Sequence, residues 1–433
     1  MPKLTLVHPR NNSGLLNISM FSYFPSMALL RLAELTPRDW EVKIIDERFE
    51  QIDYDAPADL VGITALTSVA PGAYRIADKF RKKGVPVVIG GQHASFMPYE
   101  ALTHADSVAC GEADEIWPAI LSDVKNHRLK SRYQPDSLPA LDLPVQRAVS
   151  HVRKTKFFGF LPYSTDFLFI QATRGCPFGC EFCSVTIFNG KEVRARSLKS
   201  IARTLIGYLS KYEVLVFVDD NIMMYPDPRE LFSTLKQVGV KVWITQTDIR
   251  IGNADVVDAA VESGLAAVYV GLESIDPAIL AGTAGKTKSA WSARYEENIK
   301  RLRENGVIVE AGFIFGSKTE NFDTIKRTVE WAVRVGIDVV NFWILTPMPG
   351  TNLFQRMLNE KRIKIPDWTK YDGFNYVIEP DGCWNQETLK EGVRWAYEQF
   401  YSFSSIFKRG RRLPFLSEAA WLGANLGYRR FGA

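Results

Sequence analysis

The sequence predicts an α/β protein in which an N-terminal doubly wound, Rossmann-like domain precedes a partial (β/α)6 barrel and a helical C-terminal region. Short apolar runs alternate with helical stretches along the chain, and this alternation lapses only between about 128 and 165. The chain has 433 residues, more than the usual roughly 100–200 residues of one domain. We therefore expect domains at 1–130 and 166–350, a linker at 131–165 and a C-terminal region at 351–433.

The first domain is expected to contain five buried strands, at 4–9, 40–47, 60–66, 85–91 and 105–111. Helical stretches such as 26–35 and 72–84 separate them, and strict alternation implies a parallel sheet. Ligands of such sheets bind beyond the carboxyl ends of the strands. The candidate binding residues at these ends are Thr64, Thr67, Ser68, Gly90, Gly91, His93 and Glu112. The alternative for the glycine pair is a tight turn with no ligand.

The segment 131–165 contains "QPDSLPALDLPVQ", whose three prolines suit a linker or a draped extended segment. A second series of strands follows, at 167–175, 214–221, 241–249, 266–274, 307–316 and 339–347. Helical stretches such as 200–209 and 324–336 lie between them. Six strands in this pattern predict a partial barrel with its site at the carboxyl-end mouth.

Composition excludes several classes of protein. Hydrophobic residues make up 46% and charged residues 24%, which is ordinary for a folded soluble chain. The net charge is only +4 and the basic residues are dispersed, which argues against a nucleic-acid partner. No apolar run approaches the roughly 18 residues that span a bilayer, and the chain starts directly with a strand. We expect a cytoplasmic monomer.

The stretch "RGCPFGCEFC" places Cys176, Cys180 and Cys183 at spacings of four and three residues. A structural zinc site needs four ligands, and no second cysteine pair exists, since Cys110 and Cys383 are isolated. Iron–sulfur clusters are held by cysteine thiolates, normally four for a [4Fe–4S] unit. Three thiolates would leave one iron open to a small molecule.

The CxxxCxxC pattern, with the aromatic Phe182 before its last cysteine, resembles the radical SAM superfamily. This resemblance implies that Cys176, Cys180 and Cys183 bind a [4Fe–4S] cluster whose open iron binds S-adenosylmethionine. It further implies that "FVDDN", "GLES" and "GFIFGSKTE" meet the methionyl amino group, ribose and adenine. The S-adenosylmethionine-binding residues implied in this way are Phe182, Asp219, Asp220, Asn221, Glu273, Ser274, Gly312, Ile314 and Gly316. The carboxylates could instead be helix caps or solvated charges.

The N-terminal "GGQHAS" and "GEADE", followed by the cysteine motif, resemble the cobalamin-binding group of this superfamily. "TPMPGT" (346–351) and "IPDWTKYD" (365–372) resemble the branch with hopanoid C-2 methylases and anaerobic magnesium-protoporphyrin ester cyclases. The resemblance implies bound cobalamin. Many cobalamin domains carry a D-x-H-x-x-G motif whose histidine binds the lower face of cobalt, and this sequence has no such motif. We therefore expect no histidine on cobalt. His93 is the nearest candidate for a contact with cobalamin, and the alternative is a loop histidine that bonds the backbone.

The resemblance implies a C-methyltransferase that acts on an unactivated carbon of an apolar substrate: an isoprenoid, a lipid or a tetrapyrrole. A one-electron donor such as flavodoxin or ferredoxin would reduce the cluster. We expect the carboxylates of Asp219 and Glu273 to bind S-adenosylmethionine and not to act as acid–base catalysts. One alternative is an anaerobic oxidative cyclase or another carbon-skeleton enzyme with the same cofactors. Another is a cobalamin or cluster sensing module.

The C-terminal region is rich in aromatic residues, and Trp368 and Tyr371 are the candidate substrate contacts. One apolar helical face is predicted to cover the barrel, formed by Leu389, Val393, Ala396, Phe400, Phe403 and Phe407. A basic group then follows: Lys408, Arg409, Arg411 and Arg412. These four residues predict peripheral contact with an anionic membrane surface, which would be the inner membrane surface of the cell.

Overall fold

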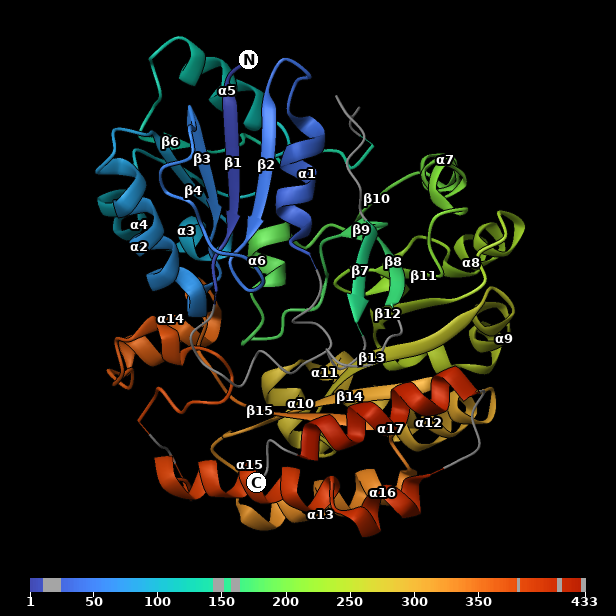
Figure 1. Ribbon diagram of the computed structural model, residues 1–433. Coiled ribbons are helices and arrows are strands. Elements are labelled where there is room, and N and C mark those ends of the chain that lie inside the picture. Colours follow the sequence, from blue (N-terminus) through green and yellow to red (C-terminus); the bar gives the residue numbers. More distant parts are fainter. Residues whose placement is uncertain (11–24, 143–151, 157–163, 380–381, 411–414, 430–433) are drawn as a thin grey trace.

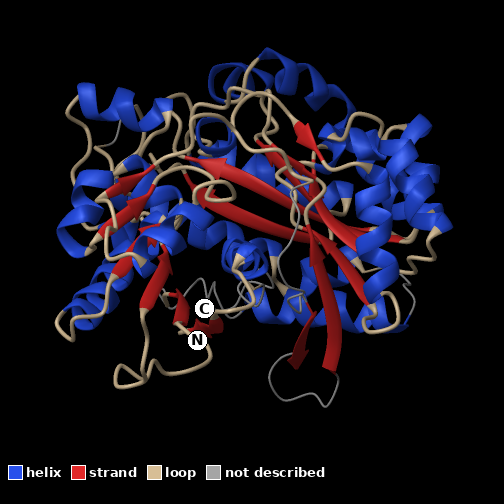
Figure 2. Ribbon diagram, turned by 90° about the horizontal axis from the view of Figure 1, so that it is seen from above, coloured by secondary structure: helices blue, strands red, loops and turns tan. Residues whose placement is uncertain are grey.

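The computed structural model describes residues 1–10, 25–142, 152–156, 164–379, 382–410 and 415–429. These residues form two large sheets with their own flanking helices and a small two-stranded ribbon, and C-terminal helices pack beside the second large sheet (Figure 1). Seen from above, the strands run through the middle of the molecule and the helices lie around them (Figure 2).

The N-terminal sheet has six parallel strands in the order β2-β1-β3-β4-β5-β6. They are β1 (Lys3–His8), β2 (Glu41–Asp46), β3 (Leu60–Thr64), β4 (Val87–Gly90), β5 (Ser107–Ala109) and β6 (Arg132–Tyr133). The connecting helices are α1 (Met27–Leu35), η3 (Thr67–Val69), α2 (Ala70–Arg81), α3 (Gln92–Phe96), α4 (Pro98–His104) and α5 (Trp117–Lys125). The first five strands overlap the ranges predicted from the sequence, with β1 beginning one residue earlier, and β6 was not predicted.

Helices cover both faces of this sheet. On one face, Val61 of β3 belongs to a buried cluster with Phe80 of α2. On the other face, Leu6 of β1 belongs to a second cluster with Leu29 of α1 and Trp117 of α5. Two buried faces are the hallmark of a doubly wound sheet, so the predicted fold class of this domain is confirmed.

The second sheet has the order β15-β14-β13-β12-β11-β8-β7. Six of its strands are parallel and form the predicted partial barrel, and β7 is an antiparallel addition that was not predicted. The strands are β7 (Val152–Lys156), β8 (Ser164–Ile170), β11 (Val214–Phe217), β12 (Trp243–Thr247), β13 (Leu265–Glu273), β14 (Ile308–Phe315) and β15 (Val339–Ile344). A separate two-stranded ribbon consists of β9 (Thr173–Arg174) and β10 (Arg194–Ala195).

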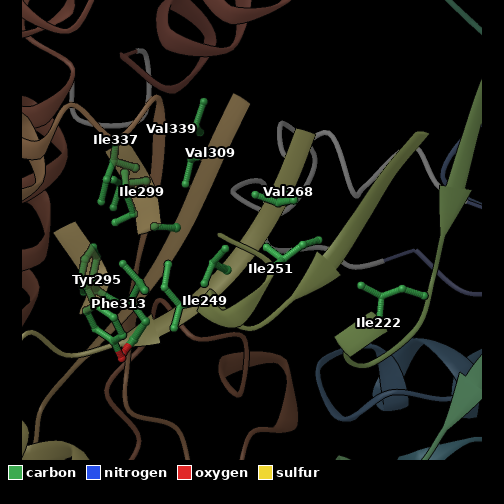
Figure 3. Packing of buried hydrophobic residues seen from close by; sticks show 14 of the residues in the cluster. Ile222, Ile249, Ile251, Val268, Tyr295, Ile299, Val309, Phe313, Ile337 and Val339 are labelled. Atoms are coloured by element: carbon green, nitrogen blue, oxygen red, sulfur yellow. The ribbon is translucent and has the colours of Figure 1, made fainter. Parts of the chain in front are cut away.

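Helices of the second unit follow its strands. They are α6 (Val185–Asn189), α7 (Leu198–Tyr208), η5 (Ile222–Met224), α8 (Pro228–Gln237), η6 (Ile249–Gly252), α9 (Ala254–Glu262), α10 (Pro277–Thr283), α11 (Lys286–Trp291), η7 (Ser292–Arg294), α12 (Tyr295–Glu304), α13 (Phe322–Val335), α14 (Asn352–Asn359) and η8 (Trp368–Lys370). Their apolar faces fill a core against the strands. Figure 3 shows Val309 and Phe313 of β14 near Tyr295 and Ile299 of α12.

The C-terminal helices are α15 (Gln386–Phe400), α16 (Phe403–Arg409) and α17 (Phe415–Arg429). The predicted apolar face holds along α15, where Leu389 and Phe400 are buried. It does not continue into α16, where Phe403 is 65% and Phe407 87% exposed. The side chain of Ser402 accepts a hydrogen bond from the amide of Ser405 and starts a new helix, which breaks the period.

Arg409 is not part of a surface patch, contrary to the prediction. Its guanidinium is 1% exposed and donates hydrogen bonds to the carbonyl of Asp338 (2.8 Å) and to Oδ1 of Asn425 (2.8 Å). It also lies 3.8 Å from the ring centroid of Phe400. Arg409 therefore joins the C-terminal helices to the barrel, and Arg411 and Arg412 lie outside the described residues.

The domain boundaries remain predictions. Both β6 and β7 fall within 131–165 and extend the two sheets into the expected linker. In the part of the chain that the structure describes, no helix combines the length and the apolar character that crossing a bilayer demands.

Candidate functional site

The cysteine loop, residues 176–183, lies between strand β9 and helix α6 at the carboxyl end of β8. The amide of Cys176 donates a hydrogen bond to the carbonyl of Gly190 (3.1 Å), and the amide of Cys183 donates to the carbonyl of Cys180 (3.1 Å). The amide of Glu181 donates to the carbonyl of Thr283, the last residue of α10 (2.9 Å). The loop is thereby fixed against the mouth of the barrel.

The three thiols of this loop are free, with Cys180 buried and the other two half-buried. Burial raises the pKa of all three thiols, that of Cys183 to about 12, while the ammonium of Lys288 favours each thiolate. Among the described residues, no three Cys, His, Asp or Glu side chains converge on one metal ion. A [4Fe–4S] cluster does not need such convergence, because each thiolate binds a different iron. Three free thiols on one loop beside a cation therefore fit a cluster.

Three of the predicted S-adenosylmethionine residues come together at the barrel mouth. Phe182, Glu273 and Ile314 line one small hollow, although they come from the cysteine loop, β13 and β14. Glu273 is a non-glycine residue with a φ of +65°. Strained backbone of this kind persists where the surroundings hold it, and it concentrates at functional sites.

Lys288 of α11 was missed by the sequence reasoning. Its ammonium donates a hydrogen bond to Oε1 of Glu273 (3.2 Å), and both side chains are only 15% exposed. Burial alone would lower the pKa of Lys288, but the charges of Glu273 and Cys180 outweigh burial and raise it. The lysine stays cationic beside the cysteine loop, where it can bind a negatively charged group.

Asp219 and its neighbours mainly connect strand ends. The buried carboxylate of Asp219 accepts hydrogen bonds from the amide of Ala172 (3.0 Å) and the hydroxyl of Thr173 (2.6 Å). Burial raises the pKa of Asp219 to about 6, although these hydrogen bonds oppose the shift. Contact between this carboxylate and S-adenosylmethionine stays a prediction.

Asp220 and Asn221 are also engaged within the protein. Oδ2 of Asp220 accepts from the side-chain amide of Asn189 (3.0 Å). The side-chain Nδ2 of Asn221 donates to Oδ2 of Asp248 (2.8 Å), and its Oδ1 accepts from the backbone amide of Asp248 (3.1 Å). These bonds join β11 to α6 and to the end of β12.

The remaining predicted residues of this group differ in role. Ser274 is buried, and its hydroxyl accepts from the amide of Asp276 (3.1 Å). A side chain at Gly312 would overlap the hydroxyl of Tyr269, so this position needs glycine for packing. Gly316 has a φ of +119°, and its amide donates to Oε2 of Glu320 (2.8 Å). Ser274, Gly312 and Gly316 therefore each make close contacts with the protein near the ends of β13 and β14.

A cavity of about 520 Å³ lies between the two units. Four of the predicted cobalamin residues line it, namely Thr64, Gly90, Gly91 and Glu112. The barrel contributes Ile170, Gln171 and Arg174, and helices α1 and α7 form the sides. Its volume and largely apolar wall are typical of a cofactor site. Small residues at Gly90 and Ala109 leave room for close approach to the backbone, which fits a bulky cofactor.

Thr67, Ser68 and His93 are not among the residues that line this cavity. His93 is fully buried: its Nδ1 lies 3.3 Å from Oγ1 of Thr67, and its ring meets Trp368 edge-on at 5.1 Å. These contacts place His93 in the packing between the N-terminal domain and η8. Its role as a cobalamin contact stays a prediction.

Trp368 joins the two units, and Tyr371 packs against it. Nε1 of Trp368 donates to Oε1 of Glu100 in α4 (2.8 Å). Tyr371 is buried 4.8 Å from the Trp368 ring, and its hydroxyl donates to the carbonyl of Ile365 (3.0 Å). Direct contact of either ring with substrate stays a prediction.

Comparison with known proteins gives two family matches. Residues 170–354 match the radical SAM superfamily, and residues 17–121 match the B12 binding domain. The chain is 33% identical to bacteriochlorophyllide d C-8(2)-methyltransferase of Chlorobaculum tepidum over 88% of this chain and 87% of that protein. It is 29% identical to the C-12(1)-methyltransferase of the same organism, over 95% and 90%.

The expected branch is confirmed by more distant relatives. An anaerobic magnesium-protoporphyrin IX monomethyl ester cyclase of Cereibacter sphaeroides is 24% identical over 94% of this chain and 71% of its own length. A hopanoid C-2 methylase of Rhodopseudomonas palustris is 21% identical, with 83% and 69% covered.

Among solved structures, the fold is similar to that of the radical S-adenosylmethionine methyltransferase TsrM of Kitasatospora setae, with cobalamin and a [4Fe–4S] cluster bound. The TM-score is 0.66 at 16% identity, and the match covers 83% of this chain and 75% of that one. The two family matches, the full-length relatives and the cysteine loop beside a shared cavity agree: the chain belongs to the cobalamin-binding radical SAM family, whose cofactors are a [4Fe–4S] cluster, S-adenosylmethionine and cobalamin.

Proposed function

We propose that this chain is a C-methyltransferase that acts on an unactivated carbon of an apolar substrate of the tetrapyrrole class. The observation that carries the proposal is the 520 Å³ cavity, which is lined by strand ends of both units and by Arg174 next to the cysteine loop. When bound, the cluster and S-adenosylmethionine supply radical chemistry, and cobalamin carries the methyl group.

The residues of the chain position and shield these groups. Cys176, Cys180 and Cys183 would hold the cluster, and Lys288 with Glu273 would supply charges at the mouth. The apolar wall of the cavity would exclude water from reactive species.

The substrate class rests on the full-length similarity to two enzymes named for bacteriochlorophyllide d. An isoprenoid or a lipid is the alternative within the apolar class, and a relative named for hopanoid methylation favours it at lower identity. Fold and cofactors alone do not distinguish these substrates.

The test is anaerobic turnover of chlorophyllide-type tetrapyrroles with S-adenosylmethionine that carries a trideuterated methyl group. We expect a product in which a trideuteromethyl group replaces one hydrogen, and loss of that product when the three cysteines of the loop become alanine. A mass change without label would favour an oxidative cyclase, which a relative of that name supports. Absence of deoxyadenosine under reducing conditions would contradict any radical enzyme.

We further propose that the enzyme works as a cytoplasmic monomer, reduced by flavodoxin or ferredoxin, with peripheral membrane contact through α16. The exposed Phe403, Phe407 and Lys408 support such contact, because apolar and basic side chains together suit a lipid surface. Co-sedimentation with anionic liposomes should fall in a Phe407→Ser, Lys408→Ala double variant. Equal sedimentation of variant and wild type would remove the membrane contact.

A further inference from the structure

Arg174 lies at the junction of the two units, two residues before the cysteine loop. Its Nη1 donates hydrogen bonds to Oε2 of Glu112 (2.7 Å) and to Oδ2 of Asp114 (2.7 Å), both in the loop that follows β5. Its Nε donates to Oε1 of Gln171 at the end of β8 (2.8 Å). One guanidinium thus spans the strand ends of both sheets.

The ribbon partner of Arg174 reinforces this contact. Arg194 pairs with Arg174 across β9 and β10, and its guanidinium bonds both oxygens of Glu112, one of them at 3.0 Å. The carboxylates of Glu112 and Asp114 are 2% and 5% exposed, so little water competes for them. Charge-assisted bonds in such surroundings are short and directional.

A second tie lies at the other end of the cysteine loop. The hydroxyl of Ser184, next to Cys183, donates to Oε1 of Gln92 at the start of α3 (3.1 Å). The loop is therefore held at both ends by residues that follow strands β4 and β5 of the N-terminal sheet. Those strand ends line the cavity between the units.

We propose that Arg174 is a positioning residue that fixes the cysteine loop at a set distance from the cobalamin-binding edge. Radical chemistry needs both cofactor sites in register with one substrate carbon, and a displacement of about 1 Å can cost roughly 100-fold in rate. The inference depends on the two cofactors and not on which substrate is methylated.

The test uses full-length, cofactor-loaded Arg174→Gln. This variant is expected to fold, because Glu112 keeps Arg194 and Asp114 keeps Arg31 (2.8 Å), so neither buried carboxylate loses its last cation. Pulsed electron paramagnetic resonance measures the dipolar coupling between the reduced cluster and cobalt(II). We expect wild-type iron and cobalamin content, a broadened distance distribution, and partial recovery in Arg174→Lys.

Arg48→Gln is the matched control. Arg48 is 13% exposed, close to the 16% of Arg174, but its ion pair with Asp46 lies within the N-terminal domain (2.7 Å). If Arg174→Gln loses its cluster, Asp114→Asn tests the same contact from the other domain and should also broaden the distribution. A wild-type distribution in Asp114→Asn and in cluster-loaded Arg174→Gln would overturn the proposal, as would equal broadening in Arg48→Gln.

Discussion

Gly90 and Gly91 are neighbours at the carboxyl end of β4, and the structure predicts different consequences of replacing them: a loss of stability at Gly91 and weaker cobalamin binding at Gly90. Gly91 has a φ of +94° and a ψ of 179°, a conformation that is nearly exclusive to glycine. A Cβ there would lie 2.8 Å from the carbonyl oxygen and 2.9 Å from the amide nitrogen of Ala65. A Cβ at Gly90 would meet only Ala109, at 3.5 Å, which is ordinary contact.

We therefore expect Gly91→Ala to destabilise the N-terminal domain by about 2 kcal/mol or more, since backbone strain alone costs roughly 1–3 kcal/mol. Gly90→Ala should change stability by less than about 1 kcal/mol. Gly90→Leu should place its side chain in the cavity and weaken hydroxocobalamin binding at least about tenfold, or roughly 1.4 kcal/mol.

Thermal and urea unfolding of the cofactor-free proteins measures the first effect, and equilibrium dialysis with hydroxocobalamin measures the second. Gly90→Leu that melts like wild type and binds cobalamin with wild-type affinity would refute the assignment of this cavity. Gly91→Ala with wild-type stability would refute the steric argument at Ala65.

Three further outcomes are expected. Alanine at Cys176, Cys180 and Cys183 should abolish the roughly four irons that one [4Fe–4S] cluster brings, and iron that survives this triple change would reveal a second site. Because His93 is packed away from the cavity, the cobalt(II) spectrum should lack imidazole nitrogen coupling, and its presence would contradict a histidine-free lower face. Burial raises the pKa of Glu310 to about 7, so the folded chain keeps a proton that the unfolded chain releases between about pH 4.5 and 7. Rising pH therefore lowers the free energy of unfolding of the wild type. Urea titrations from pH 4.5 to 8 should show the free energy of unfolding of Glu310→Gln rising by up to about 3 kcal/mol relative to wild type. A difference between the two proteins that does not change with pH would contradict the buried proton.

The sequence predicted the strands well where burial gave them a long apolar run. All six parallel barrel strands and the first five strands of the N-terminal sheet lie where apolar runs end in polar or glycine residues. Strand β6 has only two residues, too few for any periodic pattern, and β7 lies in a segment whose prolines suggest a linker. Such short or edge strands depend on pairing with a neighbour, which the local sequence does not record.

The location of the site was predictable, but the bonding of its residues was not. The cysteine spacing predicted the metal ligands, because three thiols within eight residues have few other uses. Lys288 and Arg174 carry no such signal, since a single basic residue is usually a solvated charge. Their partners lie 15 and 60–62 residues away, at Glu273 and in the loop after β5.

The strand-end rule predicts where polar residues gather, and hydrogen-bond partners decide what each one does. Carboxyl ends of parallel strands meet at one edge whatever their side chains, so Asp219 and Glu112 each had to lie at that edge of their own sheet, where the cofactor sites are predicted. Both carboxylates nevertheless accept hydrogen bonds from the protein. Asp219 accepts them from amides after β8, and Glu112 accepts them from the guanidinium groups of Arg174 and Arg194. A buried carboxylate that accepts several such bonds is more useful as a rigid joint than as an exchangeable ligand. Asp219 joins two strand ends within the barrel, whereas Glu112 joins the N-terminal unit to the barrel. We therefore expect a conservative change at Glu112 to disturb the distance between the cofactors before it disturbs cofactor binding.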